Sequence, residues 1–251
     1  MLLSKRLDKI LETLNSDKNM TVKQLAAKMY VSEATMRRDL TKMEQLGFLK
    51  RYHGGAVVAE KTVEPSVIIR MEQNSAEKRR IAEAAAAEVT AYSSFMLDSS
   101  STVKCLSDYW NIRHSVVFTT GIETAAVFSK ISDTEVVIPG GVLKYNNYSV
   151  EGPLTLESIN NFRADVLLCS CGAVGNDGFL TESSAEQCAI KKAMFKNCGV
   201  RILMFDKSKF SAARSFVSCN ITEFNTVITD KSLPESLENI CRNANVKVIV
   251  V

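Results

Sequence analysis

The chain has 251 residues, a hydrophobic fraction of 46% and a formal net charge of +3 at neutral pH. This length suits one small and one medium domain, and the apolar content is ample for both cores. No apolar run is long enough to span a bilayer, and the N-terminus lacks the apolar segment of a signal peptide. These features argue against a membrane protein, and we expect a soluble, cytoplasmic protein without a membrane partner.

The basic residues are unevenly distributed along the chain. Residues 1–60 contain 11 Lys and Arg against 7 Asp and Glu, whereas residues 61–251 contain 20 against 21. Neutralising DNA phosphates with Lys and Arg releases counterions, so a nucleic-acid-binding domain is expected to carry such an excess. We therefore expect the first part of the chain to bind nucleic acid and the remainder to bind another kind of partner.

Two helices are predicted before residue 30. Leucine and isoleucine recur at three- and four-residue intervals between residues 3 and 14, which is typical of an amphipathic helix. Thr21 and Gln24 then form the pattern of a capping box, in which each side chain satisfies a free backbone N–H at a helix start. A short second helix should follow through Met29.

A third helix is expected to carry the residues that contact DNA. Ser32 suits its N-cap, and Met36, Leu40 and Met43 fall on one face, which predicts that this face is buried. Arg38 and Thr41 would then point outward, and Arg37 would flank this exposed face. Arg is the usual bidentate partner of guanine. The residues that we assign to DNA contact on this helix are Ser32, Glu33, Thr35, Arg37, Arg38 and Thr41.

A β-hairpin is predicted after the helix stop at Gly47. Residues 48–52 and 56–58 favour two short strands around a His-Gly-Gly turn, in which glycine supplies the positive φ. This hairpin would be the wing of a winged helix-turn-helix. Its Lys50, Arg51 and His53 are predicted to lie along the sugar-phosphate backbone, where they would position the protein without reading sequence.

A small helical bundle whose charges only maintain solubility is the alternative for residues 1–58. An Arg-Arg pair on an isolated helix would fit that alternative. Here the cap, the short preceding helix, the turn and the hairpin occur in the order of a winged helix-turn-helix, which favours DNA binding.

The remaining sequence predicts a larger α/β domain. Residues 59–74 are charged and contain Pro65, and we interpret them as a linker between a domain of residues 1–58 and one of residues 75–251. A helix is expected over residues 77–89. Seven short runs rich in β-branched residues then alternate with helical stretches, which predicts a doubly wound, mostly parallel sheet. These runs are residues 95–97, 116–118, 136–138, 166–168, 201–205, 227–229 and 246–251.

Polar residues and glycines follow most of these predicted strands. Ligands of such sheets bind beyond the carboxyl ends of the strands, and a run of hydroxyl and N–H groups at a helix start suits an anion. Turn chemistry alone explains any single loop, but five converging loops favour a small-molecule pocket. We assign effector binding to Asp98, Ser100, Ser101, Thr102, Thr119, Gly140, Gly141 and Gly172, with positive charge from Lys191 and Lys209.

The seven cysteines lack the spacing of a disulfide framework, which fits a reducing compartment. Cys169 and Cys171 lie in the apolar run of residues 166–171, without the partners that a metal or redox site would need. We expect them to pack in the core, and we expect no cofactor and no metal.

Several of these segments resemble the DeoR family of bacterial transcriptional regulators, and the resemblance extends over nearly the whole chain. Residues 31–40, 51–56 and 206–210 are the most specific, and residues 140–141, 151–152 and 177–179 support them. The resemblance implies a winged helix-turn-helix fused to a domain similar to ribose-5-phosphate isomerase. It also implies a repressor of carbohydrate-metabolism genes that binds double-stranded operator DNA, responds to a phosphorylated sugar and forms a homodimer or homotetramer.

The chain departs from the family pattern in two loops. Ser100 replaces the usual glycine of the phosphate loop, and its Cβ would restrict the approach of a phosphate to the backbone. The usual Thr-Asn-Ser after the next strand is Thr119, Thr120 and Gly121, which removes an amide and a hydroxyl. These departures predict an atypical effector or a partly degenerate pocket.

Three functions stay open at this point. The first is a DNA-binding repressor controlled by a phosphorylated metabolite, and the second is a DNA-binding regulator whose larger domain serves only for oligomerisation. The third is a sugar-phosphate isomerase in which Asp98 acts as base and Lys209 stabilises the enediolate. The sequence offers no accompanying His or carboxylate-pair motif for an isomerase, and an isomerase has no use for Arg37 and Arg38.

Overall fold

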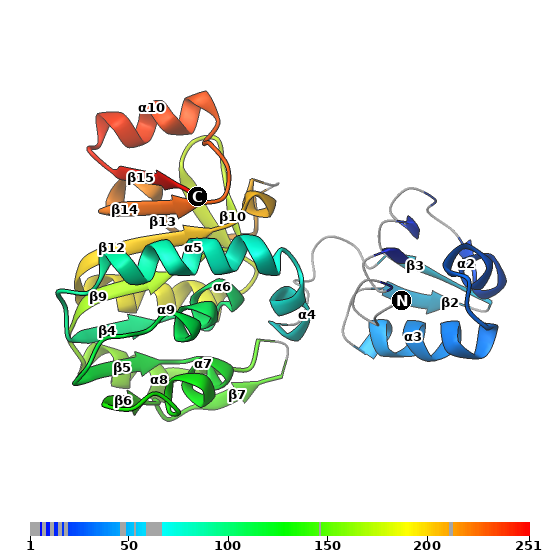
Figure 1. Cartoon of the computed structure of the whole chain (residues 1–251), viewed down its shortest axis with the longest axis horizontal. Coiled ribbons are helices and arrows are strands. Elements are labelled where there is room, and N and C mark those ends of the chain that lie inside the picture. The colour runs from blue at the N-terminus through cyan, green and yellow to red at the C-terminus, as the bar shows by residue number, and fades with distance from the viewer. Residues whose placement is uncertain are drawn as a thin grey trace. The chain divides into compact units, whose positions relative to one another are not determined.

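The computed structural model describes residues 6, 9–10, 13–14, 17, 20–45, 49–52, 54–58, 67–145, 147–210 and 213–251. The chain forms two compact units, Met1–Glu72 and Gln73–Val251 (Figure 1). In the part of the chain that is described, no helix is long and apolar enough to cross a membrane.

The first unit contains a winged helix-turn-helix, as the sequence predicted. Its elements are β1 (Met20–Thr21), α2 (Val22–Met29), α3 (Glu33–Gln45), β2 (Leu49–Tyr52) and β3 (Gly55–Val58). The strands form an antiparallel sheet in the order β1-β3-β2. Thr21 caps α2 in the predicted capping box with Gln24. Of the helix expected over residues 3–14, residues 6, 9–10 and 13–14 are described, and they are helical.

The core of this unit is built from the apolar positions that the periodicity indicated. Met36, Leu40 and Met43 of α3 are fully buried, and they pack with Leu25 of α2 and Leu49 of β2. The helix α4 (Val67–Glu72) lies within residues 59–74, which the sequence predicted as a linker. Six residues are too few to show a helical period, so periodicity could not reveal α4.

The second unit is built around a seven-stranded sheet in which all neighbouring strands are parallel. The predicted doubly wound fold is confirmed, because all seven expected strands belong to this sheet. Their order is β15-β14-β12-β9-β4-β5-β6. The strands are β4 (Ser94–Leu97), β5 (Ser115–Thr119), β6 (Thr134–Val137), β9 (Ala164–Cys169), β12 (Cys198–Phe205), β14 (Thr226–Thr229) and β15 (Lys247–Val250).

Helices cover both faces of the sheet, so its central strands are largely buried on two sides, whereas the edge strands β6 and β15 keep exposed residues. Phe95 and Leu97 of β4 belong to the cluster with α5 (Ser75–Glu88) and α7 (Ile122–Phe128), whereas Met96 belongs to the cluster with α8 (Pro153–Asn160) and α9 (Ala185–Lys196). The helix α10 (Glu235–Asn243) contributes Leu237 to this second cluster. In Figure 1, α5 crosses one face of the sheet while α8 and α9 lie behind it.

Two antiparallel sheets that the sequence did not predict are added to this unit. The first is a hairpin of β7 (Val142–Lys144) and β8 (Ser149–Glu151). The second has the order β10-β11-β13 and comprises β10 (Ala173–Val174), β11 (Phe179–Glu182) and β13 (Phe216–Asn220). The strand order of the main sheet reverses between β4 and β9, and such a switch point is where α/β sheets bind ligands, at the carboxyl ends of the strands.

Candidate DNA-binding surface and effector site

The orientation of α3 is determined by its cap and its buried face. The Ser32 hydroxyl accepts a hydrogen bond from the Thr35 N–H at 3.2 Å, which satisfies a free donor at the helix start. Because Met36, Leu40 and Met43 are buried, the opposite face points outward. Glu33 lies in the first turn and is exposed, and Thr35 is half-buried with its hydroxyl 3.0 Å from that of Ser32.

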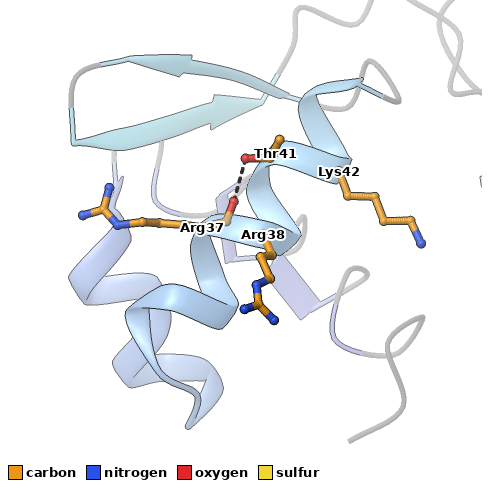
Figure 2. Close-up of a pocket in the computed structure, with 4 residues that line it drawn as sticks. All are labelled: Arg37, Arg38, Thr41 and Lys42. Atoms are coloured by element: carbon orange, nitrogen blue, oxygen red, sulfur yellow. Dashed lines mark hydrogen bonds between the residues drawn. The ribbon is translucent and has the colours of Figure 1, made fainter.

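The outward face of α3 is basic. Arg37, Arg38, Thr41 and Lys42 line an open hollow of 510 Å³. Figure 2 shows the side chains of Arg37, Arg38 and Lys42 extending away from the helix in three directions. Arg37 lies 3.5 Å from Glu33, but both side chains are about half exposed, so this ion pair holds the arginine weakly. The surface therefore presents three cationic groups to an anionic partner.

Lys42 was missed in the sequence prediction. It lies four residues after Arg38, so both side chains are on the same side of α3, and this spacing was a signal that the sequence offered. Thr41, by contrast, is half-buried and not simply outward-facing. Its hydroxyl donates to the Arg37 carbonyl at 2.8 Å and accepts from Arg51 Nη1 at 2.6 Å.

The wing forms the predicted hairpin, but its basic side chains are arranged differently from the prediction. Lys50 is exposed, but Arg51 is half-buried and turns toward α3 instead of lying along the outer edge. His53 lies outside the described residues. The turn needs its glycines, because Gly54 has a φ of +93° and a Cβ on Gly55 would lie 2.5 Å from the carbonyl oxygen of Met20.

A buried charged cluster lies at the switch point of the second unit. The Asp98 carboxylate, directly after β4, accepts hydrogen bonds from the Ser100 and Ser170 N–H groups, each at 2.9 Å. Lys191 Nζ lies 3.4 Å from Asp98 and 2.8 Å from Glu182, and it also donates to the Ser170 carbonyl. The cluster joins the loops after two neighbouring strands to α9 and β11.

Lys191 is charged in this environment. Burial lowers the pKa of Lys191, but the carboxylates of Glu182 and Asp98 outweigh burial and raise this pKa well above its ordinary value. The lysine therefore does not add the free positive charge expected from the sequence, since two carboxylates engage one ammonium group. In the structure Lys191 neutralises the buried carboxylates of Asp98 and Glu182.

Two hydroxyl groups beside this cluster are buried without a hydrogen-bond partner among the described residues, those of Thr120 and Ser170. Leu97 pairs with Thr119 in the sheet, so the next residues, Asp98 and Thr120, follow neighbouring strand ends. A buried hydroxyl without a partner is costly, and a ligand that carries hydroxyl groups would satisfy both. Thr120 was noted at a strand end in the sequence but was not assigned to the site, and Ser170 and Glu182 were missed.

The other predicted effector residues take mainly structural positions. Ser100 has a φ of −76° and caps α6 (Ser101–Lys104), so glycine is not needed there. Thr119 accepts a hydrogen bond from the Gly121 N–H at 3.1 Å, and Lys209 is half-buried. Neighbouring atoms pack closely against Gly141 and Gly172, and Ser101 and Thr102 are buried. The Gly140 carbonyl oxygen accepts a hydrogen bond from the Thr155 hydroxyl.

Cys169 and Cys171 are buried in the core, as expected. Burial raises the pKa of both thiols, so they stay protonated at neutral pH. We predict that N-ethylmaleimide will leave both cysteines unmodified in the folded protein, whereas all seven cysteines react after unfolding in guanidinium chloride. Peptide mass spectrometry would detect this difference, and rapid labelling of either thiol in the folded state would contradict it.

The first unit presents a basic, capped helix beside a β-hairpin, and the second unit is a parallel α/β sheet with a polar switch point. This combination defines the class of winged-helix regulators with a sensor domain. Comparison with known families agrees with this class. The "DeoR-like helix-turn-helix domain" matches residues 6–62, and the "DeoR C terminal sensor domain" matches residues 73–231. The chain belongs to the DeoR family of transcriptional regulators.

Similar proteins include two regulators that this chain matches over nearly their whole length. It is 28% identical to the HTH-type transcriptional repressor CsqR of Escherichia coli, over 98% of this chain and 94% of that protein. It is 24% identical to the glycerol-3-phosphate regulon repressor of Escherichia coli, over 95% of each chain. The solved structure of ribose 5 phosphate isomerase A from Neisseria gonorrhoeae is similar over 57% of this chain and 55% of its own, with 14% identity and a TM-score of 0.39.

Proposed function

We propose that this protein represses carbohydrate-metabolism genes in the cytoplasm by binding operator DNA, and that a phosphorylated sugar metabolite controls this binding. The observation that carries the proposal is the exposed basic face of α3. Arg37, Arg38 and Lys42 extend from a capped helix whose opposite face is fully buried. In this proposal α3 enters the major groove and the exposed Lys50 of the wing contacts a phosphate.

The effector would bind at the switch point of the second unit. The hydroxyls of Thr120 and Ser170, which have no partner in the described part of the chain, would exchange hydrogen bonds with hydroxyl groups of the ligand. Asp98 and Lys191 would hold the loops around it. We also propose a homodimer or homotetramer, because a single winged helix buries too little surface for tight, specific binding.

The arrangement favours a regulator over an isomerase. Asp98 would have to act as the base in an isomerase. Its carboxylate is instead engaged by two backbone N–H groups and lies near the Lys191 ammonium group, in positions that hold the loops together. A regulator whose second unit only oligomerises stays the alternative, and ligand binding separates it from the proposal.

We predict that a sugar phosphate stabilises the folded protein, because a ligand selective for the native state raises its unfolding free energy. At a ligand concentration one hundred times Kd, the gain is about 2.7 kcal/mol. A thermal-shift screen with ribose 5-phosphate, glycerol 3-phosphate and hexose 6-phosphates would measure it. Thr120→Val should keep or raise the midpoint of the unliganded protein, because it removes a buried hydroxyl that has no partner among the described residues, and it should reduce the ligand-induced shift.

A flat response to every sugar phosphate would favour the alternative in which the second unit only oligomerises. A full ligand shift in the Thr120→Val protein would contradict the position that we propose for the ligand.

A further inference from the structure

One wing residue, Arg51, is attached to the recognition helix at two points. Its backbone N–H donates to Glu44 Oε1 at 2.9 Å, and its Nη1 donates to Thr41 Oγ1 at 2.6 Å. Thr41 and Glu44 are three residues apart on α3, so they are neighbours on the helix surface. Two attachments at different heights along the helix restrict the tilt of the hairpin as well as its position.

The Thr41 hydroxyl bonds to two groups of the protein in this arrangement. It accepts from Arg51 and donates its proton to the carbonyl oxygen of Arg37, at 2.8 Å (Figure 2). A hydroxyl group has only one proton to donate. Thr41 could therefore donate to a base edge or a phosphate only by giving up its bond to Arg37.

The Arg51 guanidinium group faces the protein. Its Nε is buried and has no hydrogen-bond partner among the described residues, whereas the preceding Lys50 is exposed. An unsatisfied buried N–H costs stability, so this arrangement is not the one that stability alone would favour. In addition, β2 is an edge strand of the sheet β1-β3-β2, and Glu44 accepts a backbone N–H from that strand.

We propose that Thr41, Glu44 and Arg51 form a latch that positions the wing against the recognition helix, and that Thr41 and Arg51 are not themselves DNA contacts. This proposal rests on the proposed DNA-binding function. It assigns Lys50 as the phosphate-contacting cation of β2 and Arg51 as a positioning residue. The latch would align Lys50 with Arg37 and Arg38 before the protein meets DNA, so that no binding energy is spent on ordering the wing.

A double-mutant cycle tests the latch. The probe is the duplex that the wild-type, full-length protein enriches from a random-sequence pool, and affinity is measured by fluorescence anisotropy. Thr41→Val and Arg51→Met should each weaken binding by about tenfold, and the double variant should also weaken it by about tenfold instead of a hundredfold. Thr41→Val removes no charge, so its loss of affinity cannot come from a lost ion pair with a phosphate. Thr41→Ser should restore binding.

Two further variants serve as matched controls. Glu44→Gln keeps the acceptor oxygen and should bind as the wild type does. Lys50→Ala should reduce the magnitude of the negative slope of log K against log salt by about 0.9, whereas Thr41→Val should leave that slope unchanged. The salt dependence separates a residue that positions the wing from one that contacts a phosphate. The thermal midpoint of each variant checks that its general stability is unchanged.

Additive losses in the cycle, or wild-type affinity of Thr41→Val, would overturn the latch. If the wild-type protein enriches no duplex, the proposed DNA-binding function fails instead, before any variant is compared.

Discussion

Replacing Lys191 with methionine is expected to lower the unfolding free energy by about 3–5 kcal/mol, as is usual when one partner of a buried ion pair is removed. Methionine is unbranched and matches the apolar stem of the lysine side chain, but it lacks the terminal ammonium group. It leaves the carboxylates of Asp98 and Glu182 buried without the ammonium group that lies 3.4 Å and 2.8 Å from them. Urea unfolding at neutral pH, followed by circular dichroism, would measure the loss.

The neighbouring Lys192 provides the control, because it lies on the same helix and is exposed. Lys192→Met should change the unfolding free energy by less than about 0.5 kcal/mol. Equal stabilities of the Lys191→Met and wild-type proteins would show that the cluster does not hold the switch point together.

The stability of the wild-type protein should also depend on pH through Lys191. Its pKa is raised in the folded state, so the ammonium group contributes fully below the ordinary pKa of 10.5, and this contribution is lost as the pH rises through the higher folded pKa. The Lys191→Met protein lacks this alkaline loss.

Replacing both Arg37 and Arg38 with alanine is expected to weaken binding to the enriched duplex by about two orders of magnitude or more, since each bidentate base contact contributes about 1–3 kcal/mol. Both side chains lie on the outward face of α3, and alanine is a good helix former. The helix should therefore stay folded while its base and phosphate contacts are lost. Gel-shift titrations would measure the affinity.

The second unit offers a matched control for this pair. Arg79 and Arg80 are also adjacent, exposed arginines on a helix, α5, and replacing both removes the same charge. That variant should keep the specific affinity within about threefold, because only non-specific attraction falls. If both double variants bind equally well, α3 is not the DNA-reading element.

Much of the fold follows from local patterns. Thr21 and Gln24 predicted the start of α2, and Met36, Leu40 and Met43 predicted which face of α3 is buried. The seven β-branched runs predicted the parallel sheet, because strands that are buried on both faces consist of continuous apolar residues. The helices α2 and α3 are long enough to display the helical period, whereas the six residues of α4 are not.

The sites were predicted less completely, because side-chain partners are distant in the sequence. Glu182 joins Asp98 through Lys191 across 84 residues of chain, and no spacing rule connects them. Arg51 was expected on the phosphate backbone from its charge alone. Only the packing of the hairpin against α3 shows that Thr41 lies within 2.6 Å of its guanidinium group.

The sequence by itself determined the order of the elements, the basic character of the first unit and the family, because these depend on residue types, on continuous apolar runs and on the 3.6-residue period of helices. The tertiary structure decided which charges face solvent and which neutralise one another. Arg38 and Arg51 are the same residue type thirteen positions apart, yet one lies on the outer face of a helix and the other bonds to that helix. Burial and the positions of distant partners decide this difference, and both exist only after the chain has folded.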